Sequence, residues 1–137
     1  MSELEQIRKE RRKSTGEDFT PGELVNEMLD KLPSEVFIDS SKTFCDPAGG
    51  NGNFVIEVLK RKLQNNHDPL IALSTIFSVE LMADNVAEMK ERLLELIPAS
   101  LHTEAMKIMN KNLKCHNALT WDFDNWKSTE IKAKKLF

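Results

Sequence analysis

The chain has 137 residues, the size of a single domain that can bury a hydrophobic core. Hydrophobic residues (40%) and charged residues (30%) occur in the proportions of an ordinary soluble globular protein. A formal net charge of −3 is not that of a free-standing nucleic-acid binder. The longest apolar runs are too short for a membrane span and no apolar segment follows the charged start, so neither a membrane protein nor a secretory signal is expected.

Basic residues cluster near both ends of the chain. Solvated tails are the favoured interpretation of these clusters, and contact with DNA phosphates is the alternative. We expect residues 1–14 to be a charged N-terminal segment and residues 127–137 to be a Lys-rich tail. The clusters are Arg8, Lys9, Arg11, Arg12 and Lys13, and then Lys127, Lys132, Lys134 and Lys135.

The first helix signal follows the N-terminal segment. Thr20 is expected as the N-cap, Pro21 as the first helical residue, and Glu23 as the acid that completes a capping box. A stripe of apolar residues at helical spacing follows, and Pro33 ends the pattern. The stripe consists of Leu24, Val25, Met28, Leu29 and Leu32.

A buried strand over about 42–46 is predicted next, followed by a glycine-rich loop and a helix that begins near Phe54. Strand, glycine loop and helix form the opening of a nucleotide-binding α/β unit. The glycines allow a tight turn and close approach of a ligand, and the helix start offers free N–H groups. The loop has neither the G-x-G-x-x-G pattern of dinucleotide-binding proteins nor the Lys-Ser/Thr of a P-loop.

The second half of the chain continues the alternation of helices and strands. A loop is expected at residues 65–69, a short helical turn at 71–73, and a second strand at 76–81. Glu80 near the end of that strand can accept both hydroxyls of a ribose, although it could also be an acid that merely ends a strand. A helix over 83–97, another that ends near Lys111, and a third strand over 114–119 complete the pattern.

Cys45 and Cys115 are expected within or beside buried strands. They lack the C-x-x-C spacing that would favour a disulfide or a metal site. Reduced thiols and a cytoplasmic location are therefore expected.

Residues 46–54, Asp-Pro-Ala-Gly-Gly-Asn-Gly-Asn-Phe, resemble motif I of the adenine-specific DNA methyltransferases. Thr15-Gly16 with Phe19-Thr20-Pro21 resembles motif X, which precedes motif I in the gamma-type order of that family. The resemblance implies S-adenosylmethionine as the cofactor and a Rossmann-like class I methyltransferase fold, here truncated after about three parallel strands. It also implies that the methionine end of the cofactor lies among Phe19, Thr20, Pro21, Asp46, Ala48, Gly50, Gly52 and Phe54.

Two further segments resemble motifs of the same family. Glu80 resembles the ribose-binding acid of motif II, with Leu81 or Met82 flanking the adenine ring. Asn117-Ala118-Leu119 resembles motif III, in which an Asp usually accepts the adenine amino group. Asn117 can accept one such bond but lacks the charge. The aromatic residues that follow, Trp121, Phe123 and Trp126, could cover the adenine edge or seal the open end of the sheet, and the second interpretation is favoured.

The catalytic motif of the family, Asn-Pro-Pro or Asp-Pro-Pro followed by an aromatic residue, does not occur in this sequence. The chain ends about where the strand that leads to this motif would begin, so residues 15–126 are expected to form only the cofactor-binding domain. Three functions stay open. The chain could be a shortened or split adenine-N6 methyltransferase that acts on DNA with a second protein chain. It could instead be a non-catalytic cofactor-binding or partner-binding module of a methyltransferase or restriction-modification complex, or a small methyltransferase for RNA or protein.

Overall fold

The computed structural model describes residues 2–7 and 19–130. Thr15 and Gly16 of the expected motif X lie outside these ranges, as do the N-terminal basic cluster and three of the four C-terminal lysines. A helical stretch occupies residues 3–7. No helix in the described ranges has the length and apolar composition needed to cross a membrane.

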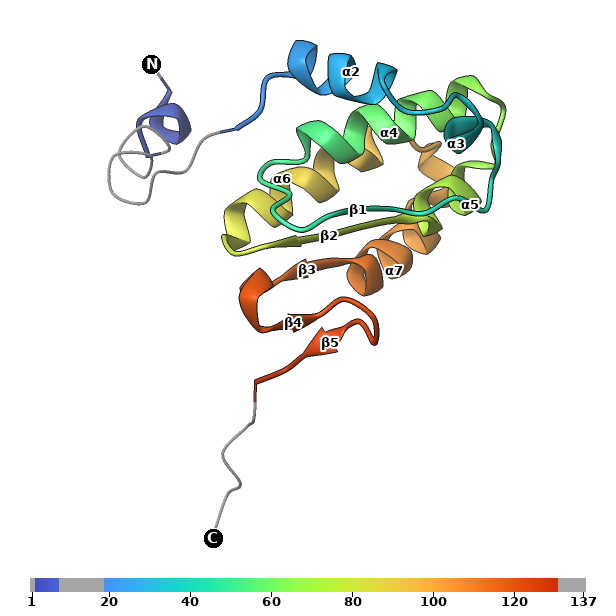
Figure 1. Cartoon of the computed structure of the whole chain (residues 1–137). Helices are drawn as coiled ribbons and strands as arrows, with labels where there is room; N and C mark the ends of the chain where they lie inside the picture. The colour runs from blue at the N-terminus through green and yellow to red at the C-terminus, as the bar shows by residue number, and fades with distance from the viewer. Residues whose placement is uncertain (1, 8–18, 131–137) are drawn as a thin grey trace, which may run out of the picture.

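Three parallel strands form the central sheet in the order β1-β2-β3 (Figure 1). Their register pairs Asp46 with Ser78 and Glu80 with Cys115, so the carboxyl ends of all three strands lie at the same edge of the sheet. This α/β arrangement is compatible with the expected Rossmann-like fold. The strands are β1 (Phe44–Asp46), β2 (Ile76–Glu80) and β3 (Leu113–Cys115).

Strand β3 is shorter than the sequence predicts. The expected strand at 114–119 ends at Cys115, because the side chain of Asn117 accepts a hydrogen bond from the Leu119 N–H (2.9 Å) and starts a 3₁₀ turn, η2 (Ala118–Thr120). Such local side-chain bonding competes with a strand ladder. Cys45 lies in β1 and Cys115 ends β3, as expected, and both side chains are exposed.

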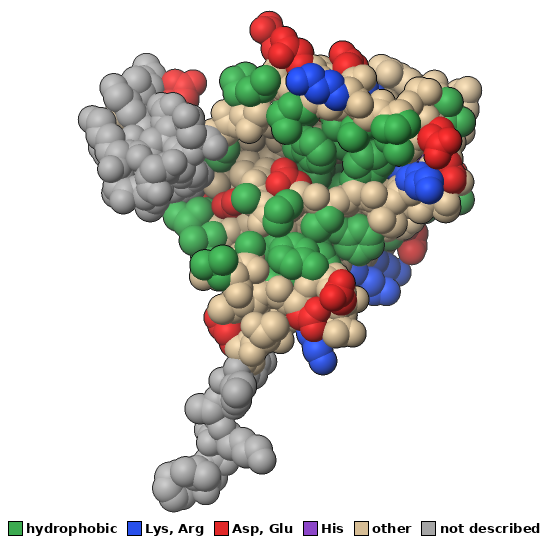
Figure 2. All heavy atoms as spheres, in the orientation of Figure 1, with side chains coloured by type: hydrophobic (Ala, Val, Ile, Leu, Met, Phe, Trp, Pro, Cys, Tyr) green, Lys and Arg blue, Asp and Glu red, His purple; other side chains and the backbone are tan. Residues whose placement is uncertain are grey.

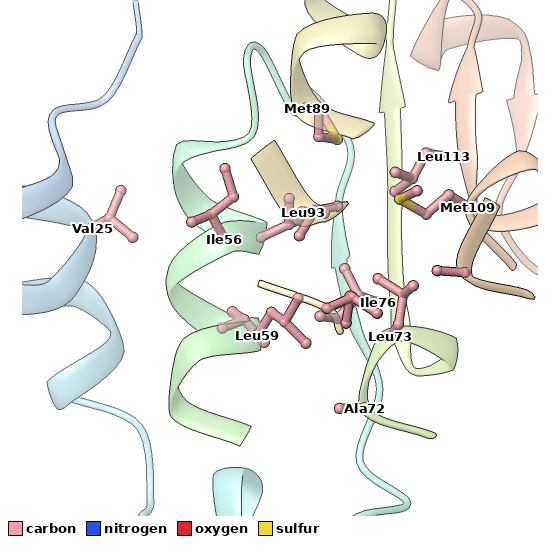
Figure 3. Close-up of a cluster of buried hydrophobic side chains, with 14 of the residues drawn as sticks. Val25, Ile56, Leu59, Ala72, Leu73, Ile76, Met89, Leu93, Met109 and Leu113 are labelled. Carbon is pink, nitrogen blue, oxygen red and sulfur yellow. The ribbon is translucent and has the colours of Figure 1, made fainter. Parts of the chain in front are cut away.

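The helices that connect the strands pack together and cover one face of the sheet. Side chains from these helices surround Ile76 and Leu113 of the sheet in a single hydrophobic core (Figure 3). Helix α2 contacts α4 and lies outside it (Figure 1). The helices are α2 (Gly22–Asp30), α3 (Glu35–Ile38), α4 (Asn53–Gln64), α5 (Pro69–Ser74), α6 (Ala83–Leu94), the 3₁₀ helix η1 (Ala99–Leu101) and α7 (His102–Asn112).

The start of α2 differs from the expected capping box. The helix begins at Gly22 with Pro21 in the N-cap position, and no side chain caps it. The Thr20 carbonyl instead accepts a hydrogen bond from the side chain of Asn53 (2.8 Å). Of the expected apolar stripe only Val25 and Leu29 are buried, and the other three residues are exposed.

The sequence also predicts a three-layer α/β half-sheet, with helices on both faces, but the other face of the sheet carries a hairpin and, among the described residues, no helix. The ring of Phe77 on β2 packs edge-on against Trp126 at 5.0 Å between centroids, and the Trp126 indole N–H donates to the Lys111 carbonyl (2.7 Å). The aromatic residues therefore cover part of the sheet. The hairpin pairs β4 (Trp121–Asp122) with β5 (Lys127–Ser128). Strand β5 lies at the start of the segment that the sequence assigns to the tail.

Candidate functional site

The glycine-rich loop is fastened to the neighbouring strand at the carboxyl edge of the sheet. The Ser78 hydroxyl donates to the Asp46 carbonyl (3.0 Å), and the Gly49 N–H donates to the Val79 carbonyl (3.1 Å). A carboxylate oxygen of Asp46 accepts from the Ala48 N–H (3.1 Å), which turns the chain away from β1. The loop that the sequence predicts is therefore a turn between β1 and α4 that hydrogen bonds tie to β2.

Gly50 and Gly52 have the left-handed backbone conformation, with φ of +54° and +97°. A Cβ atom at Gly50 would lie 2.9 Å from the ring of Phe19, and one at Gly52 would lie 2.8 Å from Met89 Cγ. Both positions thus require glycine for backbone and for space. The same contacts show that the ring of Phe19, expected over the cofactor, lies against the loop at Gly50.

Glu80 connects the end of β2 to the glycine loop. Its Oε1 accepts from the Gly50 N–H (3.1 Å), and its Oε2 accepts from the Met82 N–H (2.9 Å) and from Asn85 Nδ2 (3.0 Å). An ionised carboxylate offers roughly four acceptor positions, so these three bonds leave room on Oε1 for a ligand donor. Glu80 is only partly buried, whereas Asn85 is fully buried.

A second network crosses the loop from α6. Nη1 of Arg92 donates to the Asn51 carbonyl (3.1 Å) and to Asn53 Oδ1 (2.8 Å). The amide nitrogen of Asn53 in turn donates to the Thr20 carbonyl. Asn53 therefore joins the segment before α2 to the loop and to α6. The side-chain oxygen of Asn51 is buried, and no donor among residues 2–7 and 19–130 lies within hydrogen-bonding distance of it.

Two adjacent cavities open beside the loop, with volumes of about 250 and 60 Å³. The larger one extends along β1 towards Val25 and Met28, and the smaller one lies under Phe19 and beside Asn51. Half of the residues that the sequence proposes for the site line these cavities. Thr20, Asp46, Ala48 and Phe54 line both, and Phe19 and Gly50 line the smaller one.

Asp46 lines both cavities, and its surroundings disfavour the charged form of its carboxyl group. Burial raises the pKa of Asp46, and the nearby charge of Glu80 raises it further, while the hydrogen bond from the Ala48 N–H opposes both effects. Burial also raises the pKa of the Cys45 thiol, with a smaller contribution from the charge of Asp46. A cation placed beside Asp46 would stabilise its charged form and so oppose both effects on its pKa.

The remaining expected residues lie outside the two cavities. Pro21 and Gly52 shape the chain on either side of them, and Glu80 reaches the loop only through Gly50. Leu81 is 62% exposed beyond the end of β2. The side-chain oxygen of Asn117 is bonded to Leu119, and Ala118 lies in the same 3₁₀ turn.

The sequence analysis missed five residues of these networks: Asn51, Asn53, Ser78, Asn85 and Arg92. A signal existed for Asn85, because it lies one helical turn before Met89 on the inward face of α6. A polar residue on an apolar face indicates a specific hydrogen-bond partner inside the protein. Asn53 and Arg92 carried no such signal, since their partners come from distant parts of the chain.

A larger cavity, of about 360 Å³, lies between α2, α3 and α4 and away from the loop. Its two cationic side chains already have partners. Arg61 is paired with Asp30 (2.7 Å) and with the side chain and carbonyl of Asn26, and Lys60 is paired with Glu57 (3.3 Å). Size alone therefore does not make this cavity the better candidate, and the loop cavities contain the unusual acid and the unpartnered acceptor.

Comparison with known proteins gives one partial relationship. A stretch of 43 residues, 31% of this chain, is 46% identical to the Type II methyltransferase M.VspI of Vibrio sp. (strain 343). This stretch spans 10% of the length of that relative. No protein-family model and no solved structure matches the chain. The partial match supports a relationship to methyltransferases.

Proposed function

We propose that this chain binds S-adenosylmethionine and is the cofactor-binding part of a DNA adenine-N6 methyltransferase. The observation that carries the proposal is the meeting of three features at one edge of the sheet: the ring of Phe19 over Gly50, and the carboxylates of Asp46 and Glu80 at the ends of adjacent parallel strands. Ligands of open α/β sheets bind at this edge. The partial match to a Type II methyltransferase supports the choice of cofactor.

We assign the methionine end of the cofactor to the two adjacent cavities, with its ammonium group in the smaller one. Its ammonium group needs acceptors, and the cavity offers the carboxylate of Asp46 and the buried oxygen of Asn51. A bound cation would lower the raised pKa of Asp46 and would partner an acceptor that otherwise has none among the described residues. The apolar wall that Phe54 and Met28 form is suited to the carbon chain.

The nucleoside end is assigned to Glu80 and the residues that follow β2. The free acceptor position on Glu80 would take ribose hydroxyls, and the exposed side chain of Leu81 would flank the adenine ring. Asn117 remains a candidate for the adenine amino group, although its oxygen already accepts from Leu119.

In the family that the loop resembles, methyl transfer to adenine requires Asn-Pro-Pro or Asp-Pro-Pro followed by an aromatic residue. These 137 residues contain no such motif. We therefore infer that residues from outside them, such as a second protein chain, complete the catalytic site on DNA. A purely cofactor-binding module within a methyltransferase or restriction-modification complex is the second candidate.

Calorimetric titration with S-adenosylmethionine tests the proposal. The wild-type chain should bind, and Glu80→Ala should bind at least about tenfold more weakly, since hydrogen bonds to a charged acceptor contribute roughly 1.5–3 kcal/mol each. Glu91→Ala on the exposed side of α6 is the matched control and should leave the affinity unchanged. No binding by the wild type would refute the proposed function, and equal affinity of the Glu80 variant would remove Glu80 from the site.

A further inference from the structure

We propose that Asn85 is a positioning residue that holds the Glu80 carboxylate in the orientation needed to recognise a ribose. This inference rests on the proposed function, because it assigns a role to a residue that supports the ribose-binding acid without touching the ligand. Asn85 lies in the first turns of α6, five residues after Glu80, and is 0% exposed.

The direction of the hydrogen bond between the two side chains is fixed by their chemistry. An ionised carboxylate can only accept, so the amide nitrogen of Asn85 must be the group that faces Glu80 Oε2 at 3.0 Å. The bond is charge-assisted and therefore stronger than a bond between neutral groups. The Met82 N–H holds the same oxygen from the backbone at 2.9 Å.

These bonds leave the carboxylate little rotational freedom. Two donors hold Oε2 on the side of α6, and the Gly50 N–H holds Oε1 on the side of the loop. The free acceptor position on Oε1 then points in a set direction next to Gly50. Removal of the Asn85 amide would take away one of the donors that hold Oε2, leaving the Met82 N–H, and would let the plane of the carboxylate turn.

Packing alone does not account for an asparagine at this position. The neighbours of Asn85 on the inward face of α6 are Val86, Met89 and Leu93, all apolar and buried. An apolar side chain would bury more favourably there, since a buried amide is costly unless it is hydrogen-bonded. The bond to Glu80 gives the buried amide nitrogen of Asn85 a charged partner.

The test compares S-adenosylhomocysteine with its 2′-deoxy analogue, which lacks one ribose hydroxyl. By calorimetry the wild-type chain should prefer the hydroxylated ligand by at least about tenfold, as expected for a bond to a charged acceptor. In Asn85→Leu, which keeps the volume, and in Asn85→Ala, this preference should fall below about threefold. Leu93→Val, another buried change on α6, should lower stability but keep the preference.

The preference ratio is a readout that a merely structural role of Asn85 would not change. Full preference retained in a folded Asn85 variant would overturn the inference and leave the proposed function standing. Failure of the wild type to bind either ligand would overturn the proposed function itself. If neither variant folds, the side-chain amide resonances of wild-type Asn85 decide: they should shift more with the hydroxylated ligand than with the deoxy analogue, and equal shifts would overturn the inference.

Discussion

Asp46 is a residue that the fold places where the charged form of its side chain is disfavoured. Its carboxyl group is half-buried at the end of β1 and lies near a second acid, Glu80, so its pKa is raised. The native protein therefore holds the Asp46 proton to a higher pH than the unfolded chain does. Buried acids of this kind are common at binding sites, because a cationic ligand can relieve the cost that the empty protein bears.

Replacement of Asp46 by Asn should stabilise the protein at neutral pH. Between the ordinary value of 3.8 and the raised folded pKa, the native state binds more protons than the unfolded state, so stability falls as pH rises through this interval. Asp46→Asn removes that loss and keeps an oxygen to accept from the Ala48 N–H. Urea denaturation at pH 7 should show a larger free energy of unfolding for Asp46→Asn, and the difference should shrink towards about pH 4.

The same variant should bind S-adenosylmethionine more weakly, because the acceptor for the ammonium group loses its charge. If the wild-type chain is more stable than Asp46→Asn at neutral pH, the charged form of Asp46 does not destabilise the fold as we infer.

At the scale of elements, the site depends on ties between segments that are distant in sequence. Asn53 at the start of α4 accepts from Arg92 of α6 and donates to the Thr20 carbonyl ahead of α2. Because Phe19 adjoins Thr20, this tie also holds the ring of Phe19 against Gly50. Three helices and the loop are thus fixed to one another by a single amide.

Asn53→Ala should weaken cofactor binding as well as stability. The loss of its hydrogen bonds should lower the free energy of unfolding by roughly 1–2 kcal/mol, and release of the segment at Phe19 should lower the affinity for S-adenosylmethionine. Asn112→Ala is a matched control, since Asn112 donates to the Ser74 carbonyl (3.0 Å) ahead of β2, at the other end of the sheet. It should cost stability without any change in affinity, and equal affinities of the two variants would exclude this role for Asn53.

The sequence predicts local features well where one short segment contains the cause. The loop at residues 46–54 is an example, because its glycines are required by the backbone conformation at Gly50 and Gly52. The prediction of the third strand is wrong beyond Cys115, because the hydrogen bond from the Leu119 N–H to the Asn117 side chain competes with pairing in the sheet. The tie between Asn53 and Thr20 spans 33 residues, and no local pattern contains it.

At the scale of the whole molecule, the two faces of the sheet are unequal. Helices cover one face, while a hairpin covers part of the other among the described residues. Figure 2 shows apolar side chains gathered over the region where the strands lie in Figure 1, with Lys and Arg towards the periphery. Helical periodicity predicts the apolar stripe of α2, but it cannot reveal that Leu24 and Met28 of that stripe are exposed.

Purified residues 1–137 should transfer no methyl group to adenine in DNA, even with saturating S-adenosylmethionine. A flipped base must be oriented towards the methyl group, and positioning of this kind can account for about 7–11 kcal/mol of a barrier. The sequence contains no Asn-Pro-Pro or Asp-Pro-Pro motif to supply it. Incorporation of tritium from labelled cofactor into unmethylated DNA is the measurement, and incorporation that disappears in Asp46→Ala would contradict the expectation.

The hairpin of β4 and β5 contains an intrinsic spectroscopic probe of folding. The chain has two tryptophans, and both lie in this hairpin, with their ring centroids 5.3 Å apart and their planes at 83°. Indole emission and near-ultraviolet dichroism therefore report on the seating of the hairpin against Phe77, while far-ultraviolet dichroism reports mainly on the helices of the opposite face. Coincident melting curves from the two signals would mean that both faces of the sheet unfold as one cooperative unit.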